Sequence, residues 1–135
     1  MRKVSLVLLV LIIVALLPQH RTDAQDGDMI GPEEYPEGIN PLTGLPVYDP
    51  EVLLRRPILV KVVNAPDMAR PQWGLPQADV VWEYWMPGGF TRFAAIFYSQ
   101  SPERVGPIRS LRMPDFELAH IYNSLIATSG MANGY

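Results

Sequence analysis

The sequence predicts a fold of the α/β or α+β class, in which a mixed sheet with a β-hairpin packs against at least one helix. Three observations predict it. A run rich in β-branched residues spans 58–64, two strand-like runs flank the turn sequence Pro87-Gly88-Gly89, and a helix pattern begins at Pro114. The chain ends soon after a further strand pattern at 125–128, so we expect an incomplete domain.

The strand at 58–64 is expected to be buried, because it is almost continuously apolar. Residues 65–76 contain three prolines and a glycine and are therefore a loop, with Trp73 as its packing anchor. The loose alternation of residues 79–86 predicts a strand with both faces largely covered. Residues 90–98 then complete the β-hairpin.

The helix predicted at 114–122 follows a loop at 101–113 that carries three arginines. Proline is favoured in the first turn of a helix, which supports the start at position 114. Phe116, Ala119 and Tyr122 recur every three residues and are the expected buried stripe of this helix.

Residues 1–24 have the layout of a signal peptide or an N-terminal membrane anchor. The basic pair Arg2-Lys3 precedes an apolar run at 4–17, and a polar stretch to Ala24 follows Pro18. Fourteen helical residues span roughly 21 Å, less than a hydrocarbon core of about 30 Å, which favours a cleaved signal peptide over a stable transmembrane helix. We therefore expect an extracytoplasmic protein, secreted or anchored to the membrane by this segment.

Residues 25–51 are expected to form an acidic leader rich in proline and glycine. They contain seven acidic residues and no Lys or Arg, and they keep no period of 2 or 3.6. Turn-forming residues are dense at 40–46, which favours an ordered turn docked against the domain. The domain proper is expected to occupy residues 52–135.

Charge and cysteine content exclude several classes of protein. The net charge is −3, and the few basic residues form no cationic cluster of the kind that nucleic acid requires. The sequence has no cysteine, which excludes disulfides, thiol nucleophiles and lipidation of a cysteine. His20 and His120 are isolated from other metal-ligating residues, so no metal or cofactor is expected.

Five motifs occur in one order within residues 38–130: Asn40-Pro41-Leu42-Thr43-Gly44, Ala69-Arg70-Pro71-Gln72-Trp73-Gly74-Leu75, Ala78-Asp79-Val80-Val81-Trp82-Glu83, Gly88-Gly89-Phe90-Thr91-Arg92-Phe93 and Glu103-Arg104-Val105-Gly106-Pro107-Ile108-Arg109-Ser110-Leu111-Arg112. Together they resemble the N-terminal domain of the YerB-like family of bacterial lipoproteins, a domain of unknown function. The resemblance implies an exported cell-envelope protein, normally longer and with a second domain, and it supplies no reaction or catalytic residue. Two departures are the lack of a cysteine for lipidation and an end inside the family's domain, which suggests a truncated copy.

Six charged residues of the hairpin, the following loop and the helix start are candidate ligand-binding residues: Glu83, Arg92, Arg104, Arg109, Arg112 and Asp115. Guanidinium groups near a helix N-terminus can bind a carboxylate or a phosphate. The structural alternative is that Arg92 pairs with Glu83 across the hairpin while Asp115 caps the helix or pairs with Arg112, which holds the loop in place.

The expected function is a non-catalytic binding module of the cell envelope, whose partner is an anionic cell-wall ligand or an envelope protein. One alternative is a cell-wall glycan hydrolase that uses Glu83 and Asp115 as a carboxylate pair. Another is a truncated fragment with no function of its own. The serines lack a nucleophile elbow and a neighbouring base, which disfavours a serine hydrolase. The aromatic residues of 73–98 are compatible with a sugar platform, although core packing explains most of them better.

Overall fold

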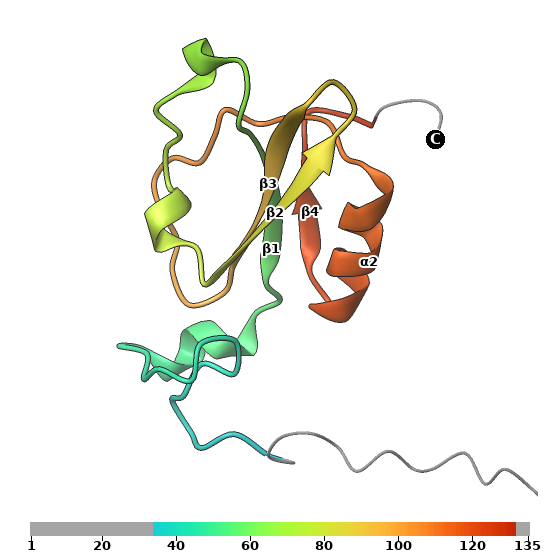
Figure 1. The fold of residues 1–135 in the computed structure, drawn as a ribbon. Coiled ribbons are helices and arrows are strands. Elements are labelled where there is room, and N and C mark those ends of the chain that lie inside the picture. Colours follow the sequence, from blue (N-terminus) through green and yellow to red (C-terminus); the bar gives the residue numbers. More distant parts are fainter. Residues whose placement is uncertain (1–33, 132–135) are drawn as a thin grey trace, which may run out of the picture. The chain divides into compact units, whose positions relative to one another are not determined.

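The computed structural model describes residues 34–131, and Figure 1 shows their fold. Within this range the chain forms a four-stranded mixed sheet and one α-helix, so the predicted mixed sheet with a hairpin and a packed helix is confirmed as an α+β fold. The strands are β1 (Ile58–Val63), β2 (Val80–Met86), β3 (Phe90–Phe97) and β4 (Leu125–Ala127), and the helix is α2 (Met113–Ile121).

The signal peptide or anchor predicted at 1–24 and the first part of the acidic leader lie outside the described residues. Among residues 34–131, no helix has the length and apolar character needed to cross a membrane.

The strand order is β2-β3-β1-β4, which places β1 and β3 at the centre of the sheet. β1 pairs antiparallel with β3, with Lys61 opposite Ala94, and parallel with β4. β2 and β3 form the predicted hairpin, with Met86 opposite Phe90 at the turn. The central strands hold most of the buried apolar residues, among them Leu59 and Val62 of β1 and Ala95 and Ile96 of β3, so both of their faces are covered.

Each face of the sheet has its own apolar core. On one face, Leu59, Ala94 and Ile96 pack against Leu118 of α2. On the other face, strand residues such as Val62 and Phe97 are covered by loop residues: Leu75, Ala78 and Val105. Figure 1 shows the same arrangement, with α2 on one side of the strands and the long loops on the other.

β2 differs from the sequence-based expectation, because it is not covered on both faces. Trp82 is 44% exposed and Trp85 is 76% exposed. The reason is the strand order: among residues 34–131, β2 is an edge strand whose only neighbour in the sheet is β3. These two tryptophans are therefore not among the aromatic residues that core packing explains.

α2 is also rotated relative to the predicted stripe. Ala119 and Tyr122 do pack against the core, but Phe116 is 40% exposed, and the buried helix residues are Asp115 and Leu118. An ion pair between Asp115 and Lys61 of β1 accompanies this rotation. The apolar spacing alone therefore placed the stripe incorrectly.

Part of the predicted leader docks against the sheet as an ordered turn. Asn40 is buried, and its Nδ2 donates to Oδ1 of Asp79 at 2.6 Å. The other carboxylate oxygen of Asp79 accepts the backbone N–H groups of Tyr98 and Ser99. Asp79 thus joins the turn at 40–46 to the end of β3.

The strand order predicts how two substitutions affect stability. We expect Leu59→Ala in the centre of β1 to lower the free energy of unfolding by about 2–5 kcal/mol, because it leaves a cavity. The matched edge substitution Trp85→Thr is expected to change it by about 0.5 kcal/mol or less, because that side chain is mostly exposed. Urea unfolding of the purified full chain, held in a non-ionic detergent, measures both, and equal costs would contradict the edge position of β2.

Candidate functional site

The centre of the site is a lysine buried in the middle of the sheet. Lys61 lies on β1 between Val60 and Val62, and its side chain is fully buried. A buried ammonium group requires a partner of opposite charge. Its Nζ donates to Oδ1 of Asp115 at 3.0 Å and also to the Tyr84 hydroxyl.

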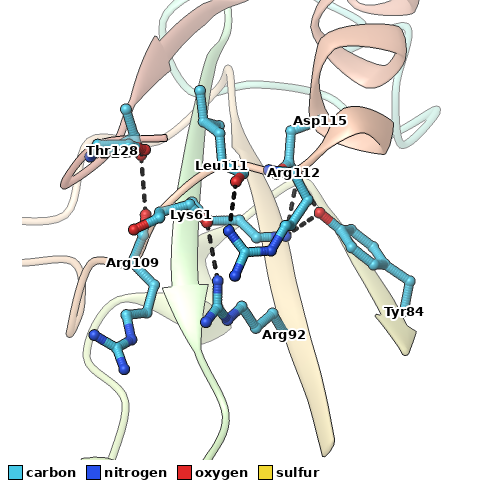
Figure 2. Close-up of polar contacts among 10 residues, drawn as sticks. Lys61, Tyr84, Arg92, Arg109, Leu111, Arg112, Asp115 and Thr128 are labelled. Carbon is cyan, nitrogen blue, oxygen red and sulfur yellow. Dashed lines mark hydrogen bonds and ion pairs between the residues drawn. The ribbon is translucent and has the colours of Figure 1, made fainter. Parts of the chain in front are cut away.

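The half-buried Tyr84 and the buried Asp115 complete a triad with Lys61, which Figure 2 shows at the start of α2. The Tyr84 hydroxyl donates to the same carboxylate oxygen of Asp115, at 2.5 Å. The other oxygen, Oδ2, accepts the backbone N–H of Arg112 at 2.7 Å. Asp115 thus caps α2, as expected if its role is structural. Three elements of the fold, β1, β2 and α2, therefore meet at one carboxylate.

The surroundings change the proton affinity of the triad. Burial lowers the pKa of Lys61 to about 8, and the positive charges of Arg92 and Arg112 act in the same direction, while Asp115 opposes them. Burial and the Asp115 carboxylate raise the pKa of Tyr84 above its usual value. Tyr84 therefore remains a hydrogen-bond donor at neutral pH, whereas Lys61 changes its charge in the mildly alkaline range.

Two arginines lie beside the triad and are anchored to the loop that precedes α2. Arg92 of β3 is only 6% exposed, and its Nη1 donates to the carbonyl oxygen of Ser110 at 3.1 Å. Arg112 is half-buried, and its Nη1 donates to the carbonyl oxygen of Leu111 at 3.0 Å. The Nε atoms of both arginines are buried without a hydrogen-bond partner among residues 34–131. Figure 2 shows both guanidinium groups beneath the start of the helix.

Arg109 adds a third positive charge at the rim of the site. Its side chain is exposed and lines a cavity of about 300 Å³ together with Ala65, Pro66, Phe90 and Arg92. Its backbone is fixed, because its N–H donates to the Lys61 carbonyl at 2.8 Å and its carbonyl accepts the Thr128 hydroxyl. Burial lowers the pKa of Arg92, and the charges of Arg112 and Arg109 lower it further, which reflects the closeness of the three cations.

The structure brings together Arg92, Arg109, Arg112 and Asp115 but leaves Glu83 and Arg104 elsewhere. Glu83 lies opposite Phe93, on the other face of the sheet from Asp115, and accepts hydrogen bonds from Thr91 and Asn64. The expected pair between Arg92 and Glu83 is absent, because the register places Tyr84 opposite Arg92.

Arg104 stacks on the ring of Trp73, 3.6 Å from its centroid. The next residue in the same loop, Val105, covers the face of the sheet opposite α2. It is therefore separate from the other three arginines.

The backbone amides of the helix start contribute less than the sequence suggested. Pro114 has no N–H, the N–H of Asp115 donates to the Arg112 carbonyl, and that of Arg112 is capped by Asp115. These three positions therefore offer a ligand no free amide at the helix start. In the described part of the chain, no three His, Cys, Asp or Glu residues are grouped in a way that could hold a metal ion.

Sequence reasoning missed Lys61 and Tyr84. Lys61 carried a usable signal, because it interrupts an otherwise apolar strand that was correctly expected to be buried. A lysine in such a strand requires a buried carboxylate, and the choice among the carboxylates depends on tertiary contacts. Tyr84 carried no comparable signal, since a tyrosine is ordinary in a half-exposed strand.

The buried ion pair predicts a large effect of one isosteric substitution. Asp115→Asn keeps an acceptor for the Arg112 N–H but leaves the Lys61 ammonium without a counter-charge. We expect the free energy of unfolding to fall by about 3–5 kcal/mol in urea unfolding, since half of a buried pair is removed. The double variant Lys61→Met/Asp115→Asn removes both charges and is expected to recover a large part of this loss; an additive cost would mean that the two residues do not interact.

The lowered pKa of Lys61 predicts that stability rises with pH. Between about pH 8 in the folded state and 10.5 in the unfolded state, the unfolded chain binds more protons, so the free energy of unfolding increases. One pKa unit corresponds to about 1.36 kcal/mol. Between roughly pH 7.5 and 9.5 the free energy of unfolding of the wild-type chain should therefore rise by about 2 kcal/mol relative to that of the double variant Lys61→Met/Asp115→Asn. Above about pH 10 the raised pKa of Tyr84 acts in the opposite direction, because the unfolded tyrosine ionises first. Parallel urea titrations measure the difference, and a flat difference would contradict a buried lysine.

A family model and two related proteins match this part of the chain. Residues 42–135 match the model described as "Protein of unknown function (DUF3048) N-terminal domain". "Putative lipoprotein YerB" of Bacillus subtilis (strain 168) is 47% identical over 94 residues, which cover 70% of this chain and 28% of that protein. The crystal structure of the YerB protein from Bacillus subtilis superposes with a TM-score of 0.65 at 46% identity, over 70% of this chain and 32% of that one.

The chain thus spans less than a third of the length of these relatives. The matched residues 42–135 include the whole triad and the three arginines beside it. Sequence and fold agree, and the chain belongs to the DUF3048 family through its N-terminal domain.

Proposed function

We propose that the protein is a non-catalytic binding module of the cell envelope, which takes an anionic ligand through Arg92, Arg109 and Arg112. The observation that carries this proposal is a pair of arginines, the buried Arg92 and the half-buried Arg112, whose buried Nε atoms have no partner among the described residues. Leaving a buried charged donor unpaired costs free energy, and such donors are found where a ligand completes their hydrogen bonds.

The local charge balance supports an anion. Asp115 is the carboxylate of the triad, and both of its oxygens are already engaged, by Lys61, Tyr84 and the Arg112 backbone. In the part of the chain that the structure describes, the ion pairs are Lys61 with Asp115 and Arg70 with Asp67. The charges of the three site arginines are therefore not neutralised by a salt bridge within residues 34–131.

The cavity beside Arg92 and Arg109 provides space for such a ligand. Its volume of about 300 Å³ lies at the lower end of the range for small-molecule sites. Phe90, Ala65 and Pro66 give it an apolar wall. An apolar wall with convergent cations suits an anionic group that is attached to a larger molecule, such as a cell-wall polymer or an envelope protein.

No observation favours the glycan hydrolase. Glu83 and Asp115 lie on opposite faces of the sheet, and Asp115 is fully buried, so the two carboxylates do not flank a common substrate. An extracytoplasmic location is part of the proposal: it is supported by the layout of residues 1–24 and by the name "Putative lipoprotein YerB" of the Bacillus subtilis relative.

The proposal predicts that a single arginine substitution weakens binding. In isothermal titration with a panel of cell-wall anions, we expect Arg112→Ala to weaken the ligand that binds best by about 10- to 100-fold, the value of a charged hydrogen bond. The matched control is Arg70→Ala, which removes an exposed arginine paired with Asp67.

The fold of each variant is checked by circular dichroism, and the full chain is used throughout. Equal weakening by both variants would indicate a general charge effect and contradict the site. Absence of binding to every anion in the panel would favour the alternative that this chain has no function of its own.

A further inference from the structure

We propose that the protein has a second binding site, for an uncharged sugar ring, at Trp85 and the polar side chains beside it on the face of the sheet opposite α2. Arg92, Arg109 and Arg112 are not part of this site. The proposal therefore does not rest on anion binding, and it is tested separately.

The strand register places Trp85 among polar neighbours. Tyr84 reaches Asp115 of α2, and successive side chains of a strand point to opposite faces of the sheet, so Glu83 and Trp85 point away from the helix. Trp85 lies directly opposite Thr91 of β3. Opposed side chains have Cβ atoms about 5 Å apart, which is within reach of an aromatic ring.

The indole of Trp85 is the most exposed apolar group of β2. Its side chain is 76% exposed, against 44% for Trp82 on the opposite face. Because β2 is an edge strand among residues 34–131, no further strand of this range covers the ring. Removing an exposed indole from water is favourable, and the flat ring also offers a stacking surface.

Four polar side chains on this face form one hydrogen-bonded network. The Thr91 hydroxyl donates to Oε1 of Glu83 at 2.5 Å. Nδ2 of Asn64, directly after β1, donates to the Thr91 hydroxyl at 2.7 Å and to Oε1 of Glu83 at 3.2 Å. Nε2 of Gln72 donates to Oδ1 of Asn64 at 3.1 Å. Three strands and the loop at 65–76 thus hold these groups in place before a ligand arrives, which lowers the entropic cost of binding.

The network leaves acceptors for the hydroxyl groups of a ligand. Oε2 of Glu83 and Oε1 of Gln72 accept no hydrogen bond from another residue of 34–131, and Glu83 is exposed. A hydroxyl group both donates and accepts hydrogen bonds. A pyranose ring combines hydroxyl groups at its rim with an apolar face of C–H groups, which matches carboxylate and amide oxygens beside an indole.

The local charge favours a neutral ligand. Nη2 of Arg70 donates to Oδ1 of Asn64 at 3.3 Å, and its Nη1 pairs with Asp67 at 3.5 Å. Together with Glu83, two carboxylates thus accompany one guanidinium group at this end of the sheet. An anion would be repelled by this balance, whereas a neutral sugar requires no counter-charge.

Saturation-transfer-difference NMR tests the site with two neutral oligosaccharides, chitotetraose and cellotetraose. The full chain is used, held in a detergent without a sugar headgroup. We expect at least one of the two to bind, with strong saturation transfer to its ring C–H protons. Sorbitol has hydroxyl groups but no ring, and it is expected to show no transfer.

Two tryptophans of the same strand provide matched variants. For the oligosaccharide that binds better, we expect Trp85→Ala to lower the affinity by about tenfold or more, and Trp82→Ala on the opposite face to change it by less than about threefold. Trp85→Phe keeps an aromatic ring and should stay within about fivefold of the wild-type affinity. Glu83→Gln should weaken binding by about tenfold, because a hydrogen bond to a charged acceptor is lost. Circular dichroism checks the fold of each variant.

Three results would overturn the sugar site. The first is the absence of binding by both oligosaccharides, and the second is an equal loss of affinity in Trp82→Ala and Trp85→Ala. The third is a dimer in size-exclusion chromatography that Trp85→Ala dissociates, because the indole would then be covered by a second copy of the chain. None of these results bears on the anion site, which the arginine substitutions test.

Discussion

The structure depends on how one buried ammonium group is compensated. Lys61 is in the middle of the central strand β1, and its charge is stable there only because Asp115 and Tyr84 reach it from α2 and β2. This requirement fixes the rotation of α2, which turns Phe116 outward and Asp115 inward. It also explains why the helix begins where it does, because the same carboxylate caps the Arg112 N–H.

The arginines are placed by the backbone that the triad organises. The chain from Arg109 to Arg112 starts beside β1, where the Arg109 N–H donates to the Lys61 carbonyl, and continues beside the segment after β4, where the Leu111 N–H donates to the Gly130 carbonyl. The carbonyls of Ser110 and Leu111 are then oriented so that they hold Arg92 and Arg112. The donors of the site are therefore pre-arranged, which reduces the conformational entropy that a ligand must overcome.

Local sequence patterns predicted the elements of this fold well but not their environment. The β-branched run at β1, the turn between β2 and β3 and the proline at the start of α2 act through short-range physics, and they were read correctly. The exposure of Trp85 and Phe116 depends on strand order and helix rotation, which involve residues far apart in the sequence. Likewise, the loop at 101–113 correctly indicated that arginines lie near the helix start, whereas the separation of Glu83 and Arg104 from the other site residues follows from strand register and loop path.

The position of Tyr84 on an edge strand has a consequence for the motions of the protein. The Lys61 side chain is fully enclosed, so its proton reaches solvent only through a local opening of the structure. β2 is hydrogen-bonded within the sheet to β3 alone, and it supplies the hydroxyl that covers the ammonium group. Edge strands open at a lower free energy than central ones. Fraying of β2 is thus one low-cost route by which water enters the charged interior, and the lifetime of the closed strand limits how fast the interior equilibrates with its surroundings by this route.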